Sequence, residues 1–428
     1  MYTRNNTSLK QQNQLFLLVH MKKRKLFKIL IVSTFSSSDG FDKMSCSSPP
    51  GKQNGPLMIT SWRATGACNL NCLYCNVNAN MKPSPDELNT EEALNLVDQV
   101  YEFGSQWFGL KGGEPLVRKD VFEIISYARS RGLKVCLLTN GYFVDGEIYD
   151  NLVKNEVYTS ISIDGPEKVN DILRGKGSYK AAISAIKKLS KAGILNGLSM
   201  AATSINYKEA EHIVNLAEEY GARFVWFNHL VPSGRAHENV HLEPTPEQYE
   251  WFLNNVYDLT KKEYKHDFGF HIHCPFYARI VKQRDPENFS DWYENEFTGK
   301  CIYFLFGGYL SVLENGDVIP CFYSEGLKIG NIKEKTLIEL WEEVKKSEFY
   351  PQLQNPNNLK GKCGGCEYRD VCGGGCRNRA HAQTGDWFGS DLACGHVPED
   401  RQENSLHTCM PATSIACVKK EKGKNPQE

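Results

Sequence analysis

A regular alternation of short apolar segments and amphipathic helical segments constrains this chain more than any other feature. The apolar segments are rich in β-branched and aromatic residues, as expected of strands. The helical segments end at glycines such as Gly104, Gly193 and Gly221, and the first of them has Thr90 as its predicted N-cap. The predicted strands are residues 58–62, 107–111, 134–138, 158–163, 198–203 and 223–228.

Strands that alternate with helices predict parallel βα units, because each parallel pair needs a crossover connection. Six units predict an α/β fold with a partial (β/α)6 barrel of the TIM type, whose chemistry lies at the carboxyl ends of the strands. A chain of 428 residues has room for more than this barrel. The predicted division is a barrel at 56–240, a connecting helical region at 241–300 and a smaller cysteine-rich domain at 301–398.

The two ends of the chain are not predicted to fold. Residues 1–55 are interpreted as a disordered leader or a misassigned start, and residues 399–428 as a charged tail. The segment from Met21 imitates a signal peptide, but Lys28 interrupts its apolar run, which is too short to span a membrane. A formal net charge of −1 indicates no nucleic-acid partner. The sequence therefore predicts a cytoplasmic protein without a membrane span.

The 15 cysteines indicate bound metal rather than disulfide bonds. A secreted disulfide scaffold is much shorter, and its cysteines rarely form C-x2-C pairs. The first array, C-x3-C-x2-C, contains Cys68, Cys72 and Cys75 and follows the first predicted strand. Iron–sulfur clusters normally take four cysteine ligands, so three would leave one iron open to a small molecule. The alternative is a zinc site, which normally needs a second cysteine pair nearby, whereas the next cysteine is Cys136.

This array, with Tyr74 before its last cysteine, resembles the signature of radical S-adenosylmethionine (SAM) enzymes. The resemblance implies that the open iron of a [4Fe–4S] cluster binds SAM, whose reductive cleavage gives a 5′-deoxyadenosyl radical. The GGEP motif after the second predicted strand resembles that family as well. Its Glu114, or a nearby carbonyl, is implied to receive the methionine ammonium of SAM. The implied SAM-binding residues are Tyr74, Gly112, Gly113, Glu114, Pro115, Asn140 and Ser162, the last near the ribose.

A second group of cysteines follows the predicted barrel and resembles the SPASM extension of radical SAM enzymes. Four of these cysteines are closely spaced, which also fits a zinc knuckle. The resemblance implies one auxiliary [4Fe–4S] cluster on Cys363, Cys366, Cys372 and Cys394. It implies a second auxiliary cluster on Cys301, Cys321 and Cys376. The usual fourth ligand of this second cluster falls at Gly307, so the cluster is absent, open at one iron, or completed by Cys274.

Several further segments, including NHLVPSGRA and CGGCEYRDVCGGGCRNRAHAQTGD, resemble the radical SAM enzymes of the siroheme-derived haem pathway. The resemblance implies oxidative decarboxylation of two propionates of Fe-coproporphyrin III to vinyls, giving haem b, with a low-potential donor such as ferredoxin or flavodoxin. Phe322 stands where sulfatase-maturing SPASM enzymes have an Asp base, which argues against that activity. The alternatives are a 12,18-didecarboxysiroheme deacetylase and a SPASM-type peptide- or protein-maturing enzyme. A non-catalytic electron carrier would need neither the GGEP motif nor a three-cysteine array.

Substrate carboxylates favour arginine partners, because the guanidinium fork matches their geometry. Two histidines in the segment HIHC, His271 and His273, are candidates for contact with a substrate iron, although a structural role is the more common one. The arginines in the resembling segments are Arg235, Arg279, Arg377 and Arg379, each of which is also open to a structural role.

Overall fold

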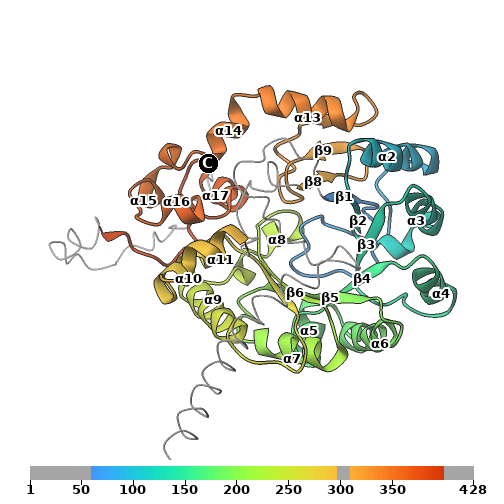
Figure 1. Cartoon of the computed structure of the whole chain (residues 1–428), viewed down its shortest axis with the longest axis horizontal. Coiled ribbons are helices and arrows are strands. Elements are labelled where there is room, and N and C mark those ends of the chain that lie inside the picture. The colour runs from blue at the N-terminus through green and yellow to red at the C-terminus, as the bar shows by residue number, and fades with distance from the viewer. Residues whose placement is uncertain (1–58, 296–308, 400–428) are drawn as a thin grey trace, which may run out of the picture.

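The computed structural model describes residues 59–295 and 309–399, and its centre is a curved parallel sheet surrounded by helices (Figure 1). The strands follow the order β10-β9-β8-β1-β2-β3-β4-β5-β6-β7 across this sheet. The predicted leader, nearly all of the predicted tail, and Cys301 lie outside the described residues. The strands are β1 Ile59–Arg63, β2 Trp107–Lys111, β3 Lys134–Thr139, β4 Tyr158–Ser162, β5 Leu195–Ala202, β6 Phe224–His229, β7 Gly269–His273, β8 Tyr309–Val312, β9 Asp317–Ile319 and β10 Gly330–Asn331.

The predicted α/β barrel is confirmed, and each of the six predicted strands is present within a few residues of its expected bounds. From β1 to β7 each strand pairs in parallel with the next one along the chain. Helices on the outer face connect the successive strands, as a parallel arrangement requires (Figure 1). The carboxyl ends of these strands therefore lie at one end of the barrel, where the first cysteine array begins.

Two further parallel strands, β7 and β8, were missed by the sequence analysis. β7 lies in the segment 241–300 that was predicted to be a helical connection, and its sequence GFHIH contains two histidines in place of β-branched residues. β8 is only four residues long and lies in the segment predicted as a separate cysteine-rich domain, yet it pairs in parallel with β1. The sheet therefore extends past the predicted boundary at residue 240 on both sides of the six-strand unit.

The first helix shows how the helices are capped. Its N-cap is Asn89 rather than the predicted Thr90, because Asn89 and Glu92 form a reciprocal capping box while the Thr90 hydroxyl donates to Asp120. The α-helices are α2 Thr90–Glu102, α3 Val121–Ser130, α4 Gly146–Lys154, α5 Glu167–Arg174, α6 Ser178–Lys191, α7 Ala210–Tyr220, α8 Arg235–Glu238, α9 Pro246–Thr260, α10 Phe276–Arg284, α11 Phe289–Asn295, α13 Leu337–Lys346, α14 Phe349–Gln354, α15 Gly361–Gly364, α16 Arg369–Cys372 and α17 Arg377–Thr384. Short 3-10 turns are η1 Pro115–Val117, η2 Val240–Leu242 and η3 Pro356–Asn358.

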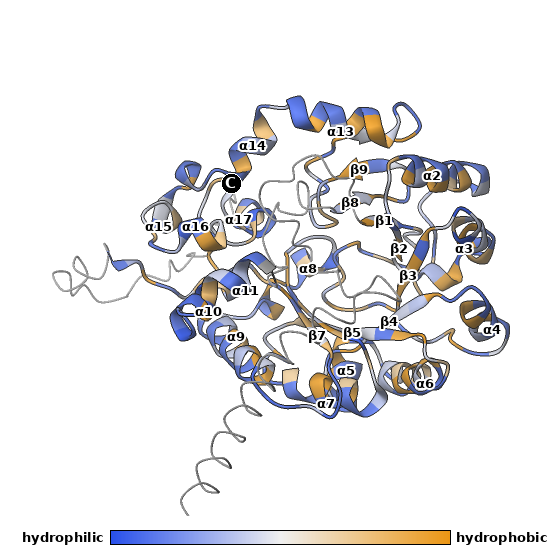
Figure 2. Ribbon diagram, in the orientation of Figure 1, coloured by the Kyte–Doolittle hydropathy of each residue, from blue (hydrophilic) through white to orange (hydrophobic). Residues whose placement is uncertain are grey.

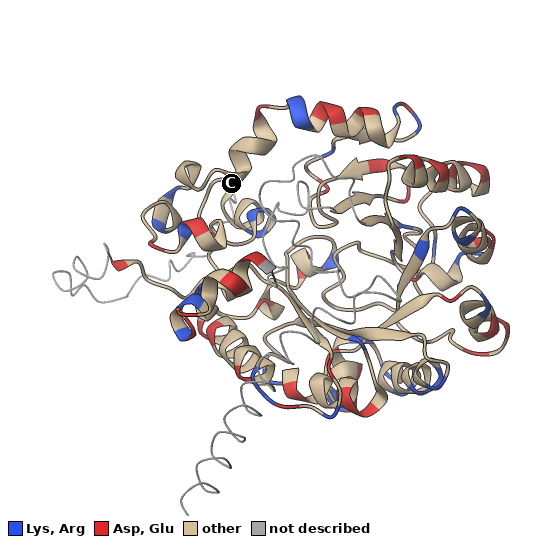
Figure 3. Cartoon of the chain, in the orientation of Figure 1, with Lys and Arg blue, Asp and Glu red and all other residues tan. Residues whose placement is uncertain are grey.

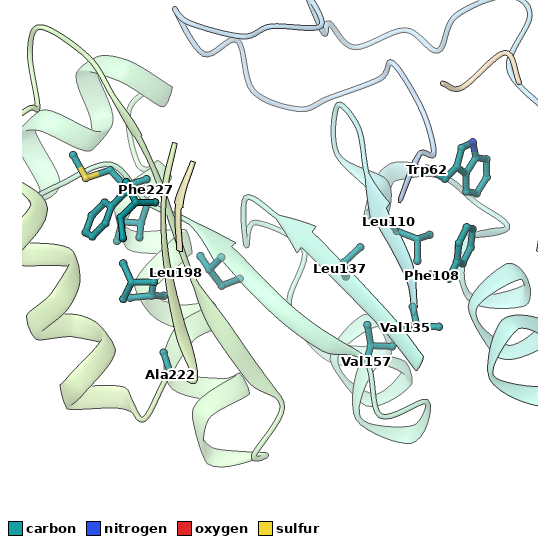
Figure 4. Close-up of a cluster of buried hydrophobic side chains, with 14 of the residues drawn as sticks. Trp62, Phe108, Leu110, Val135, Leu137, Val157, Leu198, Ala222 and Phe227 are labelled. Atoms are coloured by element: carbon teal, nitrogen blue, oxygen red, sulfur yellow. The ribbon is translucent and has the colours of Figure 1, made fainter. Parts of the chain in front are cut away.

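The two faces of the barrel sheet differ in chemistry. On the outer face Trp62, Phe108 and Leu110 are fully buried in the apolar layer beneath the helices (Figure 4). The hydropathy colouring shows helices that carry both hydrophobic and hydrophilic residues around this layer (Figure 2). Because side chains alternate along a strand, the intervening residues face the barrel interior. There the Ser61 hydroxyl hydrogen-bonds to the Tyr309 hydroxyl at 2.6 Å, so the interior is partly polar.

Acidic and basic residues are interspersed on the outer helices (Figure 3), which agrees with the near-zero net charge. Among the described residues, none of the helices combines the length and the apolar character needed to span a bilayer.

A buried ion pair connects the C-terminal helices to the barrel. The Arg379 guanidinium on α17 donates to both carboxylate oxygens of Asp391 at 2.8 Å, and both side chains are fully buried. Arg379 also donates to the Leu230 carbonyl after β6 at 3.2 Å and to the Tyr249 hydroxyl of α9 at 3.1 Å. Arg379 is therefore a structural residue, and its hydrogen-bonding groups are directed at the protein rather than at a substrate carboxylate.

We expect Asp391→Asn to lower the stability of the protein by about 3 kcal/mol, because it removes the hydrogen-bonded counter-ion of the buried Arg379 and leaves only the Glu243 carboxylate, 3.7 Å away. The measurement is the thermal unfolding midpoint of the cluster-loaded protein under anaerobic conditions. The matched control is Glu211→Gln, which removes the exposed pair with Lys262 and should cost about 1 kcal/mol or less. Equal midpoints for the two variants would contradict a structural role for the buried pair.

Candidate active site and cluster-binding cysteines

The three cysteines of the first array lie in the loop that follows β1, at the carboxyl end of the barrel. Cys68 is buried, and Cys72 and Cys75 are partly buried. Burial, with a smaller contribution from the neighbouring cysteine sulfurs, raises the pKa of Cys68 to about 12 and that of Cys72 to about 11. Thiols this close would repel one another as thiolates, so a bound cation is what would stabilise them in that form. The donor set fits a site for three of the four ligands of an iron–sulfur cluster.

Arg235 hydrogen-bonds to the backbone of the loop that carries the three cysteines. This residue of α8 donates to the Cys72 carbonyl at 2.8 Å and also hydrogen-bonds to the Ala79 carbonyl. The neighbouring Asn239 side chain donates to the Leu73 carbonyl at 3.1 Å. Arg235 was a candidate for substrate binding, but its guanidinium donates to the cysteine loop, which it therefore positions.

The two glycines of the GGEP motif allow the second loop to lie directly against the cysteine loop. The Gly113 amide donates to the Thr65 carbonyl at 2.8 Å, and the next amide donates to the Ala67 carbonyl at 2.7 Å. A Cβ at Gly113 would lie 2.1 Å from the Ala67 carbonyl oxygen, and Gly112 has φ +151°. Any larger residue would separate the two loops, so the glycines serve backbone-to-backbone packing.

Glu114 is fully buried, and its carboxylate accepts three hydrogen bonds from the protein. The donors are the Leu116 amide at 3.1 Å, the Thr139 hydroxyl at 2.8 Å and the Asn140 amide at 2.8 Å. Burial raises the Glu114 pKa to about 7, although these donors favour the charged form. The carboxylate connects the loops after β2 and β3, and Pro115 begins the short turn that follows. This geometry favours a backbone carbonyl over Glu114 as the acceptor for a ligand ammonium.

The remaining predicted SAM-binding residues end neighbouring strands. Asn140 follows β3, donates to Asn69 of the cysteine loop at 2.8 Å and lies 3.9 Å from the Cys68 sulfur. Ser162 ends β4, is half-buried and lies opposite Ser199 of β5 in the strand register. The structure therefore brings both residues to the same end of the barrel as the cysteines.

Tyr74 is oriented by Asp164, which follows β4. The Tyr74 hydroxyl donates to the buried Asp164 carboxylate, which also accepts from Arg174 at 2.6 Å. The Arg174 guanidinium lies 5.5 Å from the centre of the Tyr74 ring. Sequence reasoning missed Arg174 because it lies on α5 outside any motif, and only its contact with Asp164 reveals it.

Four cysteines of the C-terminal segment converge on one cavity near α10, α15 and α16. Cys363, Cys366, Cys372 and Cys394 line it together. Burial raises the pKa of Cys372 to about 12 and that of Cys366 to about 11, and the other cysteines of the set contribute to both shifts. The four cysteines predicted as ligands of one auxiliary cluster are thus brought together, and four thiols around one cavity match the ligand number of a [4Fe–4S] cluster.

Cys376 lies apart from that cavity, near Cys321 and Cys274. Burial, with a smaller contribution from Cys376, raises the pKa of both Cys321 and Cys274 to about 12. The predicted partner Cys301 lies outside the described residues. Ligation of a second auxiliary cluster by these cysteines remains a prediction, and the neighbourhood of Cys274 keeps it as a candidate fourth ligand.

Comparison with known proteins identifies the family. Residues 62–219 match the Radical SAM superfamily, and residues 301–367 match the SPASM iron–sulfur cluster-binding domain. The chain is 36% identical to an "AdoMet-dependent heme synthase" of Methanosarcina barkeri, over 81% of this chain and 98% of the relative. The chain belongs to the radical SAM superfamily. It is also 30% identical to an "Fe-coproporphyrin III synthase" of the same organism, over 82% of this chain and 90% of the relative.

The fold agrees with that of solved radical SAM structures. One described as native anSMEcpe with bound AdoMet superposes with a TM-score of 0.60 at 21% identity, over 79% of this chain and 94% of the other. As a radical SAM enzyme, this protein uses SAM and [4Fe–4S] clusters. This finding contradicts the two alternative interpretations of the sequence, a zinc protein and a non-catalytic electron carrier. The SPASM match ends at residue 367, so Cys372, Cys376 and Cys394 lie beyond it.

The other candidate substrate-binding residues mostly have partners within the protein. Arg279 forms an ion pair with Glu250. Arg377 donates to backbone carbonyls, including that of Gly389 at 2.8 Å. His271 stacks on Trp226 with ring centroids 5.4 Å apart, and burial lowers its pKa to about 4. These contacts favour structural roles for all three residues.

We expect replacement of Cys68, Cys72 and Cys75 together by Ala to abolish cleavage of SAM, because the cluster that binds SAM loses its protein ligands. The variant should also lose about four irons per chain, the content of one [4Fe–4S] cluster. The measurements are 5′-deoxyadenosine formation with dithionite and iron content after anaerobic reconstitution. Undiminished 5′-deoxyadenosine would contradict the assignment.

We expect the reconstituted wild type to hold about eight irons per chain with one auxiliary cluster, and about ten to twelve with two. Replacing Cys363, Cys366, Cys372 and Cys394 by Ala should remove about four of them while the signal of the SAM-binding cluster persists. A matched variant, Cys136→Ala, changes a cysteine that belongs to neither array and should leave the iron content unchanged. A wild-type value near four would mean that the C-terminal cysteines hold no iron–sulfur cluster.

Proposed function

We propose that this radical SAM enzyme converts two propionates of Fe-coproporphyrin III to vinyl groups and so produces haem b. The main support is the 36% identity to an "AdoMet-dependent heme synthase". The match covers 98% of that relative's length and 81% of this chain. We also propose a cytoplasmic location and a low-potential donor such as ferredoxin or flavodoxin.

The proposed reaction agrees with the two cysteine groups that the chain provides. Each propionate, –CH2CH2COO⁻, becomes –CH=CH2 by losing CO2, one hydrogen atom and one electron. When bound, SAM and its cluster supply the adenosyl radical that can remove a hydrogen atom from an unactivated carbon. The electron left behind needs an acceptor, and the four-cysteine cavity near α10 is a candidate site for a cluster with that role.

The protein's own residues contribute positioning. Glu114 and Asn140 connect the loops after β2 and β3 to each other and to the cysteine loop. Arg235 fixes the opposite side of that loop. Loops positioned in this way would hold the reacting carbon close to the site where the radical forms.

Phe322 argues against sulfatase maturation on structural grounds as well. Its ring lies 4.5 Å from the Lys111 ammonium, so an apolar face occupies the position at which that activity is expected to need an Asp base. Phe322 also contacts Tyr323 in a tilted arrangement, with ring centroids 4.0 Å apart. This aromatic surface is better suited to contact a flat macrocycle than to deprotonate a peptide side chain.

The second candidate is the didecarboxysiroheme deacetylase, which the relative named "Fe-coproporphyrin III synthase" favours. By its name that relative makes the compound that the first proposal consumes. Its identity to this chain is 30%, against 36% for the haem synthase relative. The first candidate is therefore preferred, and the two predict different substrates.

We expect the reconstituted enzyme, with SAM and a strong reductant, to convert Fe-coproporphyrin III to haem through a mono-vinyl intermediate. Mass spectrometry should show the loss of CO2 and two hydrogens per propionic acid side chain, which is a decrease of about 46 Da for the mono-vinyl intermediate and about 92 Da for the haem product. The parallel reaction uses 12,18-didecarboxysiroheme. Turnover of this second substrate alone would move the assignment to the deacetylase, and turnover of neither with intact SAM cleavage would favour peptide maturation.

A further inference from the structure

We propose that Lys111 is the binding subsite for a carboxylate of the substrate inside the barrel. This inference deepens the proposed function and rests on it, because it concerns how a substrate that carries propionates is held. Lys111 is not itself a predicted SAM-binding or cluster-binding residue, but it precedes Gly112 in the chain and its ammonium lies near Cys321.

Lys111 is the last residue of β2 and faces the barrel interior. Phe108 and Leu110 of the same strand are buried in the outer apolar layer (Figure 4), so the alternating residues Gly109 and Lys111 face inward. Lys111 directly precedes Gly112 of the GGEP loop, which lies against the cysteine loop. Its backbone therefore adjoins the GGEP loop, while its ammonium lies toward Tyr309 and Phe322.

The neighbours of the Lys111 ammonium include two aromatic rings and two cysteines, Cys136 and Cys321. Its ammonium donates to the Tyr309 hydroxyl at 2.8 Å and lies 5.0 Å from the centre of the Tyr309 ring. The Phe322 ring lies 4.5 Å away on the C-terminal side. An ammonium has three donors, of which Tyr309 takes one, so donors remain for an oxygen ligand.

No carboxylate compensates this cation within the part of the chain that the structure describes, since none lies within 4.0 Å of its ammonium. Two other cations of the barrel differ from Lys111 because each has an acidic partner. Arg63, which pairs with Lys111 in the strand register, forms ion pairs with Glu314 and Glu325. Arg174 pairs with Asp164 in the same way. An enclosed charge without a counter-ion is costly, and a substrate carboxylate would supply the missing partner.

At the carboxyl ends of the strands several inward-facing side chains are half-buried, whereas their outward-facing neighbours are buried. The half-buried residues include Arg63, Lys111, Leu138, Ser162, Asn228 and His273. Arg63 is paired with Glu314 and Glu325, so within this group of described residues Lys111 is the cation that lacks an acidic partner. A carboxylate that enters from this end meets the ammonium beside two aromatic rings that can contact a macrocycle.

The test measures binding of Fe-coproporphyrin III to the reconstituted full-length protein by anaerobic absorbance titration. We expect Lys111→Gln to weaken binding about tenfold to a hundredfold, since a hydrogen bond to a charged group is lost. Lys111→Arg keeps the charge and should restore most of the affinity. The matched control is Lys180→Gln, because Lys180 is an exposed lysine of α6, and its affinity should equal that of the wild type.

A second ligand separates carboxylate binding from a structural effect. The tetramethyl ester of Fe-coproporphyrin III has the same macrocycle without charges, so wild type and Lys111→Gln should bind it equally. Equal affinity of both proteins for the free acid, or an equal loss for acid and ester, would overturn the Lys111 inference. If the wild type binds 12,18-didecarboxysiroheme instead, the proposed function falls, and the same comparison on that carboxylate-bearing ligand decides the role of Lys111.

Discussion

A close approach of two backbone segments, the GGEP loop and the cysteine loop, organises the active site, and other features of the site depend on it. Gly113 approaches the Ala67 carbonyl so closely that a Cβ would lie 2.1 Å from it. This contact fixes the GGEP loop against the cysteine loop, and Glu114 extends it to the loop after β3 through Asn140. Three loops from successive strands thus form one rigid unit. A cluster held by only three thiols gains its orientation from the backbone around it as well as from its ligands.

Much of the fold and the site was predictable because the relevant signals are local in sequence. The strands β1 to β6 have continuous apolar patterns, and Cys68, Cys72 and Cys75 lie within eight residues of one another. β7 and β8 escaped prediction because GFHIH and the four residues YLSV carry little strand signal of their own. They are strands because the open edges of the sheet supply hydrogen-bond partners, a tertiary effect that overrides local preference.

The roles of individual charged residues depended on contacts between distant parts of the chain. Arg379 and Arg235 looked like candidates for substrate carboxylates, but each is used by the protein, at Asp391 and at the Cys72 carbonyl. Lys111 gave no signal, because its partner Tyr309 is 198 residues away in sequence. Whether a basic side chain of this fold is available to a substrate depends on whether folding places an acidic or carbonyl partner beside it. The sequence alone does not show this.

The pairing of β8 with β1 has a consequence for how this protein can be divided. The segment that matches the SPASM domain begins at residue 301, and β8 lies within it, yet β8 completes the sheet of the barrel. A fragment that stopped before β8 would leave the backbone groups of β1 unpaired at a sheet edge, beside the cysteine loop, and such edges attract other strands. The catalytic half and the cluster-bearing half are therefore not interchangeable modules, and chimeras between relatives should be joined after β8.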